Sequence, residues 1–125
     1  MKVCVTSEGK TLESKVDPRF GRCGYFIIAD SGTLEFKALP NPNLESTGGA
    51  GVQSGQLIAV EGVKAVITGN VGPNAYQTLE AGGVEIFTGA SGTVREAIEK
   101  YNNGELKSAS GPSVSSKFGM PGKNG

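Results

Sequence analysis

Short apolar runs alternate with longer amphipathic stretches along most of the chain. The runs are rich in β-branched residues or alternate apolar and polar positions, which predicts five strands, at 2–6, 25–29, 34–38, 65–68 and 84–87. Turn residues at 30–32 separate the second run from the third, so these two are expected to form a hairpin. Pro40 and Pro42 follow the third run and are expected to end it.

Three amphipathic stretches between and after these runs predict helices, at 51–61, 73–81 and 93–101. The last is the clearest, because its apolar residues follow helical spacing and Thr93 with Glu96 forms a capping box. Pro73 suits the first position of the second helix, and Gly82 follows its end. In the first helix, the internal Gly55 weakens the pattern.

The order of elements predicts an α/β fold. Strands joined through a helix run parallel, and the hairpin supplies one reversed member. Right-handed crossovers are satisfied by a five-stranded mixed sheet of order 3-2-1-4-5, in which strand 2 is antiparallel. Helices on both faces then give a three-layer α/β/α domain that resembles the ribonuclease H-like architecture.

The composition changes after residue 107. Residues 1–107 are predicted to form the domain, and 108–125 a flexible tail, because 11 of these 18 residues are Gly, Ser or Pro and none is acidic. The tail is expected to make no contact with the core. The alternative is a docking arm that uses Lys107, Lys117, Phe118 and Lys123.

Charge and residue usage exclude several functions. Lys plus Arg and Asp plus Glu are both 12, so a protein that wraps nucleic acid is not expected. Histidine is absent, which excludes triads that need an imidazole base. The chain has two Asp and no evident carboxylate cluster, so the fold resemblance does not predict a nuclease or another enzyme. No apolar run is long enough to span a membrane, and we expect a cytoplasmic protein with thiols at Cys4 and Cys23.

Glycines gather where the predicted strands end. The carboxyl ends of strands 1, 3, 4 and 5 share one edge of the sheet, and helices begin just beyond three of them. Helix N-termini there favour an anionic ligand, and glycine lets the backbone approach it. The alternative is that these residues only make turns and caps. The string Gly49-Ala50-Gly51 lacks the spacing of a dinucleotide fingerprint, so no nucleotide is expected. The candidate glycines are Gly48, Gly49, Gly51, Gly69, Gly72, Gly89 and Gly92.

The connection from the first strand to the second adds charge and a thiol to this edge. Arg19 and Arg22 could neutralise a ligand, and these cations would lower the pKa of Cys23 and make its thiolate a soft-metal ligand. The alternative is a tight loop in which Asp17 pairs with an arginine and Cys23 packs as a small apolar residue. Cys4 lies inside a predicted strand and is expected in the core. The candidates in this segment are Arg19, Phe20, Gly21, Arg22 and Cys23, with Cys23 as the metal ligand.

Several motifs, in their order and spacing, resemble one known family over residues 1–107. They are Asp17-Pro18-Arg19-Phe20-Gly21-Arg22-Cys23, Gly48-Gly49-Ala50-Gly51, Val66-Ile67-Thr68-Gly69, Gly72-Pro73-Asn74-Ala75, Leu79-Glu80-Ala81-Gly82-Gly83-Val84 and Gly92-Thr93-Val94-Arg95-Glu96-Ala97. The family is that of dinitrogenase iron–molybdenum cofactor biosynthesis, which includes NifX-type proteins and the C-terminal domain of NifB-type proteins. The resemblance implies the ribonuclease H-like fold.

The resemblance also implies a carrier of an iron–sulfur or iron–molybdenum cluster, which exchanges it with donor or acceptor proteins and catalyses no hydrolysis. Such relatives typically have His directly before Phe-Gly, whereas this chain has Arg19. A cluster would therefore be held by Cys23 with Arg19 and backbone N–H groups. The alternative is a stand-alone family member that binds a small anion or a protein partner without metal.

Overall fold

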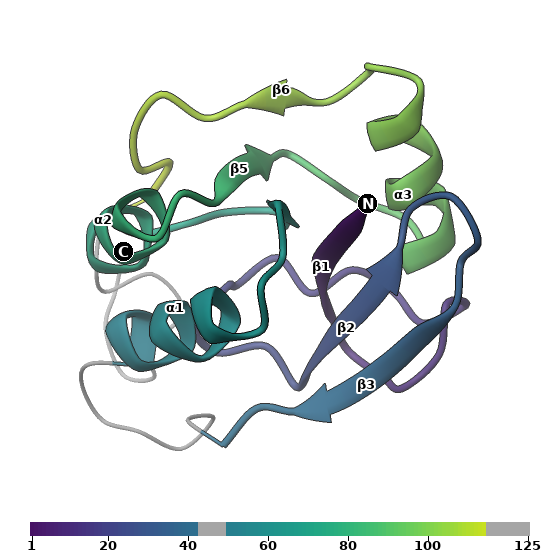
Figure 1. Cartoon of the computed structure of the whole chain (residues 1–125), viewed down its shortest axis with the longest axis horizontal. Helices are drawn as coiled ribbons and strands as arrows, with labels where there is room; N and C mark the ends of the chain where they lie inside the picture. Colours follow the sequence, from purple (N-terminus) through teal and green to yellow (C-terminus); the bar gives the residue numbers. More distant parts are fainter. Residues whose placement is uncertain (43–49, 115–125) are drawn as a thin grey trace.

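The computed structural model describes residues 1–42 and 50–114. Its elements are β1 (Lys2–Ser7), β2 (Tyr25–Asp30), β3 (Phe36–Pro40), α1 (Ala50–Val60), β4 (Ala65–Ile67), α2 (Pro73–Ala81), β5 (Glu85–Thr88), α3 (Val94–Asn102) and β6 (Lys107–Ser108). The strands form one sheet in the order β3-β2-β1-β4-β5-β6 (Figure 1). β1, β4 and β5 run parallel, and β2 is antiparallel to both of its neighbours. The predicted order of five strands and the reversed strand 2 are confirmed, and β6 is added at one edge.

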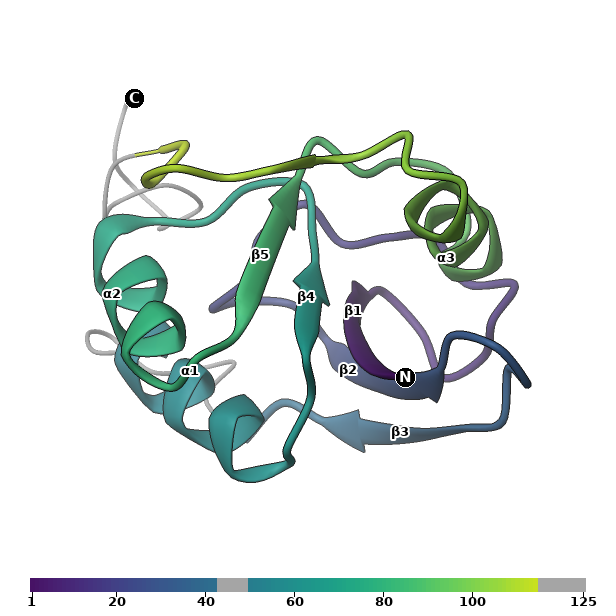
Figure 2. The same ribbon diagram turned by 45° about the horizontal axis from the view of Figure 1, so that its top comes forward.

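Helices cover both faces of the sheet, with α1 and α2 on one side and α3 on the other (Figures 1 and 2). Alternate residues of β1 therefore enter different cores. Val3 and Val5 pack in the cluster that contains α3 residues, whereas Cys4 packs in the cluster that contains α1 and α2 residues. All three are fully buried, as expected for a strand covered on both faces. The three-layer architecture is confirmed.

The hairpin turn is longer than the sequence pattern predicts. The Asp30 carboxylate accepts hydrogen bonds from the backbone N–H groups of Gly32 at 2.8 Å and Thr33 at 2.9 Å. Leu34 then takes a left-handed conformation with φ of 66°, so β3 begins at Phe36 instead of residue 34. Pro40, expected to end the strand, is its last residue. The outer side of an edge strand needs no N–H donor, which makes proline tolerable there.

The helices lie where the sequence predicts them. α2 has the predicted bounds, and α1 and α3 are displaced by one residue. The capping box of α3 is present, because Thr93 Oγ1 accepts from Glu96 N and Glu96 Oε1 accepts from Thr93 N. Gly55 inside α1 faces α2, where a Cβ would lie 2.9 Å from Thr78 Cγ2. This glycine therefore permits close packing of the two helices.

The chain after Lys107 differs from the expected free tail. β6 pairs with β5, and the N–H of Ala109 donates to the carbonyl of Ile86 at 2.7 Å. Ala109 also packs against the core on the α1/α2 side. Backbone pairing with an edge strand needs no apolar periodicity, so the composition gave no signal for it. Residues 108–114 belong to the fold. Lys117, Phe118 and Lys123 of the alternative docking arm lie outside the described residues.

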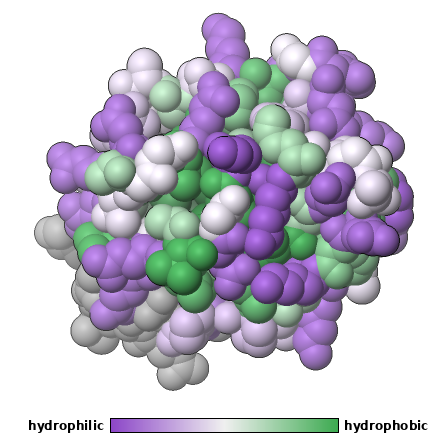
Figure 3. All heavy atoms as spheres, viewed as in Figure 1, coloured by the Kyte–Doolittle hydropathy of each residue, from purple (hydrophilic) through white to green (hydrophobic). Residues whose placement is uncertain are grey.

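The described surface is mixed in character. The face in Figure 3 is mostly hydrophilic, with apolar atoms in small separate groups. Among large apolar side chains, Val60 at the end of α1 is the most exposed, at 84%. Within 1–42 and 50–114, no helix is both long and apolar enough to cross a bilayer.

Candidate functional site

The segment between β1 and β2 returns to the carboxyl ends of β1 and β4. Asp17 N donates to the carbonyl of Thr6 at 3.0 Å. The hydroxyl oxygen of Thr6 lies 2.7 Å from the Asp17 carbonyl oxygen and 2.8 Å from the hydroxyl oxygen of Thr68, which follows β4. Both threonines are fully buried. Asp17 therefore lies at the carboxyl ends of β1 and β4. After β1 the chain continues to β2 on one side of this pair, and after β4 it continues to β5 on the other side. Open α/β sheets bind ligands at such a point.

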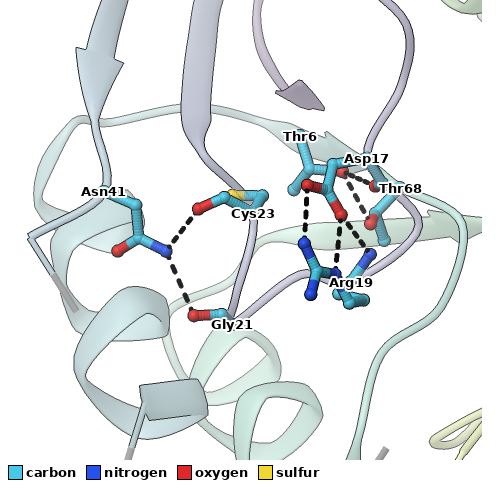
Figure 4. Close-up of polar contacts among 7 residues, drawn as sticks. All are labelled: Thr6, Asp17, Arg19, Gly21, Cys23, Asn41 and Thr68. Carbon is cyan, nitrogen blue, oxygen red and sulfur yellow. Dashed lines mark hydrogen bonds and ion pairs between the residues drawn. The ribbon is translucent and has the colours of Figure 1, made fainter. Parts of the chain in front are cut away.

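The buried carboxylate of Asp17 orients the side chain of Arg19. Its Oδ1 accepts from Arg19 N at 3.0 Å and from Nε at 3.2 Å, and its Oδ2 accepts from a terminal guanidinium nitrogen at 3.3 Å (Figure 4). The Asp17 side chain is 4% exposed and that of Arg19 is 40% exposed. The hydrogen bonds to Asp17 raise the pKa of Arg19 above its usual value, more than desolvation lowers it. The guanidinium is thus held in one orientation, with part of it in solvent.

This pairing changes the expected role of Arg19. A guanidinium has five N–H donors, and Asp17 accepts from two of them. The formal charges of the two side chains cancel. Arg19 can therefore donate directed hydrogen bonds to a ligand, but its positive charge is largely compensated by Asp17. Arg22, the second predicted cation, is half-buried in the same segment.

The Arg19 segment lies beside the loop that leads into α2. Arg19 and Asn70 form a parallel bridge, and Phe20 N donates to the carbonyl of Asn70 at 3.3 Å. A Cβ on Gly69 would lie 2.7 Å from Pro18 Cα, so only glycine fits against this segment. The structure therefore brings Arg19 together with the loop 69–72, as the sequence predicts. Gly69 serves this contact between two loops.

Cys23 lies inside the protein, in the arrangement that the sequence left as the alternative. Its thiol is free and fully buried, in the same core cluster as Cys4 and Phe20. Burial raises the pKa of Cys23 well above its usual value, and the opposing effect of Arg19 is small. The predicted lowering of this pKa is wrong, because desolvation of the thiolate outweighs attraction by an arginine already paired with Asp17.

Asn41 holds the backbone around this thiol. Its side-chain amide donates to the carbonyl of Gly21 at 3.1 Å and to the carbonyl of Cys23 at 2.9 Å (Figure 4). Its own N–H donates to the carbonyl of Gly24 at 3.0 Å. Asn41 and Asn70 therefore both form hydrogen bonds to the backbone of this segment.

The backbone donors at the N-terminus of α3, where the sequence predicts an anion contact, already have partners within the fold. Val94 N donates to the carbonyl of Ser14, and Arg95 N donates to the carbonyl of Leu12, each at 2.9 Å. Glu96 N donates to the hydroxyl oxygen of Thr93. Residues 11–16 and the capping box therefore occupy the donors that an anion would need.

The remaining candidate glycines that the structure describes have roles in backbone conformation and packing. Gly89 and Gly92 have φ values of 83° and 81°, which glycine adopts without strain. Gly51 faces α2, where a Cβ would lie 3.3 Å from Ala75 N. Gly72 precedes α2 and has no side chain to cap it. Gly48 and Gly49 lie outside the described residues.

Three site residues were missing from the sequence prediction. Asn41 carried a weak signal, since it lies between two prolines that stiffen the chain. Asn70 lies in the loop 69–72, of which the sequence prediction named only Gly69 and Gly72 as candidates. Ser113 had no signal, because its partner is a backbone group far away in sequence: Val71 N donates to Ser113 Oγ at 2.9 Å.

The side chains near Arg19 do not form a multidentate metal site. Within the described part of the chain, no group of three or more Cys, Asp or Glu residues is arranged to hold a metal ion. The geometry that is present is a fixed, partly exposed guanidinium beside the loop 69–72, at the carboxyl ends of β1 and β4. Such a guanidinium is typical of contacts to an anion.

Fold and sequence together define the class. This is a three-layer α/β/α domain of the ribonuclease H-like type, and its sequence matches the family described as "Dinitrogenase iron-molybdenum cofactor" over residues 1–104. The chain belongs to that family.

Individual relatives agree with this assignment. The chain is similar to the apo form of the orange protein from Desulfovibrio gigas, with 35% identity, a TM-score of 0.87, and coverage of 90% of this chain and 96% of the other. A Thermotoga protein provisionally assigned as NifB is 37% identical, with a TM-score of 0.74 and coverage of 86% and 91%. The uncharacterized protein MJ0580 of Methanocaldococcus jannaschii is 31% identical over 97 residues, which are 75% of this chain and 82% of that protein.

Proposed function

We propose that this protein binds and carries an anionic metal–sulfur cluster of the iron–molybdenum cofactor or precursor type, without catalysing a reaction. The cluster is cargo, received from a donor protein and passed to an acceptor. The observation that carries the proposal is the Arg19 guanidinium, fixed by a buried carboxylate beside the backbone of loop 69–72. Membership of the family, and a relative described as an apo form, support it.

The contacts available to such a cargo are hydrogen bonds to its sulfur or oxygen atoms. Arg19 supplies directed N–H groups, and the chain at 69–72 enters α2, whose N-terminal end has positive potential. Binding by these contacts leaves the cluster exchangeable, because no described side chain must form or break a covalent metal bond. We expect this exchange in the cytoplasm, where buried thiols such as Cys4 and Cys23 stay reduced.

The buried Cys23 favours a second candidate, in which the same edge binds a small anion, or a protein partner, without any metal. The two candidates differ in what the protein retains. A cluster carrier retains molybdenum and sulfur together with iron or another metal. A plain anion site does not require a metal, and it retains a metal-free oxyanion such as sulfate as well as it retains molybdate or sulfur-containing anions.

The test is anaerobic reconstitution of the full chain with iron, sulfide and molybdate, followed by removal of unbound material. Metal content per chain and visible absorption are then measured. Wild type is compared with Arg19→Lys, which keeps the charge but loses the two-pronged bond, and with Arg95→Lys as control. We expect stoichiometric metal with a sulfur-to-metal absorption band in wild type and control. Arg19→Lys should bind about tenfold more weakly, as loss of one charge-assisted hydrogen bond predicts.

Cys23→Ala separates thiol ligation from anion contact, and its small side chain fits the core. Loss of the absorption band in Cys23→Ala as well as in Arg19→Lys would show that the segment opens to ligate metal. Loss in Arg19→Lys alone would show that the cluster is held as an anion. Retention of molybdate, with no sulfur or second metal in any variant, would favour the second candidate.

A further inference from the structure

The segment after β6 crosses to the loop that leads into α2. We call residues 109–114 the C-terminal strap. It begins where Ala109 bonds to Ile86 in β5, and it ends where Ser113 N donates to the carbonyl of Val71 at 2.8 Å. Figures 1 and 2 both show it running from β6 toward the beginning of α2. The strap thus reaches the edge of the sheet at the carboxyl ends of β1 and β4, where we propose that the ligand binds.

The strap occupies a backbone donor on that edge. Val71 N donates to the hydroxyl oxygen of Ser113 at 2.9 Å, and the same hydroxyl lies 3.5 Å from Asn70 Oδ1. The Arg19 segment contacts Asn70 through Phe20. Loop 69–72 is therefore held between the Arg19 segment and the strap. The Ser113 oxygen accepts the hydrogen bond that Val71 N would otherwise offer to a ligand atom.

Within the described residues, the strap is held by few contacts. Ser110, Pro112 and Ser113 are exposed, and Ala109 is half-buried. Val114 N adds a bond to the Val71 carbonyl at 3.3 Å. Release of residues 110–114 would expose little apolar surface, so it belongs to the low-energy openings of the protein.

We propose that the C-terminal strap is an intramolecular competitor for the ligand, and that its release frees the N–H of Val71 for binding. This inference rests on the proposed function, because it takes the ligand to bind at loop 69–72. It adds a regulatory element to that site. A donor or acceptor protein that draws the strap away would change the affinity of the carrier for its cargo.

Affinity for a defined anion tests the competition. The probe is tetrathiomolybdate, a soluble anion with molybdenum–sulfur bonds, titrated anaerobically against the full chain. Ser113→Ala removes the competing hydroxyl, and Ser110→Ala is the matched control on the same strap. We expect the dissociation constant to fall two- to tenfold in Ser113→Ala, the range of one net hydrogen bond, and to stay unchanged in Ser110→Ala. A chain ending at Ala109 should bind at least as tightly as Ser113→Ala, and a chain ending at Val114 should match wild type.

Hydrogen exchange tests the contact without a ligand. The Val71 amide should exchange faster in Ser113→Ala than in Ser110→Ala, whereas the amide of Ile67 in β4 should not change. Unchanged Val71 exchange overturns the strap contact whatever the affinities. Equal affinity in all variants overturns the competition and leaves the proposed function intact, and weaker binding by Ser113→Ala would make Ser113 part of the ligand site instead. If no chain binds the probe, the proposed function fails and the competition fails with it.

Discussion

Replacing Arg19 should destabilise the fold much more than replacing another arginine of the same exposure. Arg19→Ala removes two hydrogen bonds, at 3.2 and 3.3 Å, from a carboxylate that is 4% exposed. Each charge-assisted bond contributes about 1.5–3 kcal/mol. In Arg19→Ala the buried Asp17 carboxylate keeps the hydrogen bond from the backbone N–H of residue 19 but loses both bonds from the side chain. Because the Arg19 side chain is 40% exposed, water can enter when it is removed and replace part of the lost hydrogen bonding to Asp17. We expect a loss of about 2–3 kcal/mol in the free energy of unfolding.

Arg95 is the matched control. Its Nε lies 2.7 Å from Glu13 Oε2, a shorter distance than in the Arg19 pair, and the Arg95 side chain is 41% exposed. Its partner Glu13 is 67% exposed, so water can solvate that carboxylate when the arginine is removed. Arg95→Ala should therefore cost no more than about 0.5 kcal/mol. The two variants differ in the burial of the partner, which isolates the effect of Asp17.

Urea unfolding followed by circular dichroism measures both values, provided that the slope with urea is unchanged. Combining Arg19→Ala with Asp17→Asn in a double-mutant cycle should give a coupling of about 1–2 kcal/mol. Equal destabilisation by Arg19→Ala and Arg95→Ala would refute the reasoning, because the buried carboxylate would then have no special dependence on Arg19.

Three further predictions concern the thiols, one glycine and one carboxylate. Both cysteines are buried with raised pKa values, so a thiol reagent at pH 7 should modify the native protein at least about 100-fold more slowly than the unfolded chain; fast labelling of Cys23 alone would contradict its burial. Gly69→Ala should destabilise by about 1–3 kcal/mol because its methyl would meet Pro18, whereas Gly111→Ala, with nothing within 4 Å, should be near neutral in the same unfolding assay. The N–H groups of Thr33 and Gly32 lower the pKa of Asp30, so the stability that this carboxylate contributes is complete above the unfolded pKa of about 3.9 and is lost as pH falls through the lower folded value. The difference in stability between wild type and Asp30→Ala should therefore shrink below about pH 4, and a difference that grows with acid would contradict this sign.

The sequence was sufficient for the order and direction of β1 to β5, because both follow from short-range patterns. Apolar runs, Thr93 with Glu96, and Pro73 with Gly82 determine where elements begin and end, and crossover handedness then determines strand order. The state of the site depended on contacts distant in sequence. Cys23 is buried in a core cluster with residues of β1, α1 and α2, and no local pattern predicts that these residues lie together.

The glycines show the same limit in another way. Three candidate glycines that looked alike in the sequence have different roles in the structure. Gly69 packs against Pro18, Gly92 makes a left-handed turn, and Gly51 allows α1 to contact α2. Those roles become visible once the partner surface is known. The pairing of β6 with β5 was likewise hidden, since it uses backbone groups that every residue has.

The most direct test of the central claim is a map of the amides that an anionic molybdenum–sulfur species perturbs. Isotope-labelled protein is titrated anaerobically with tetrathiomolybdate, and backbone resonances are followed by NMR. We expect the largest shifts in residues 19–23 and 69–72, which surround the Arg19 guanidinium, with little change in residues 94–96 at the start of α3. Saturable shifts centred on 94–96 or on the opposite edge of the sheet, with 19–23 and 69–72 unmoved, would contradict it.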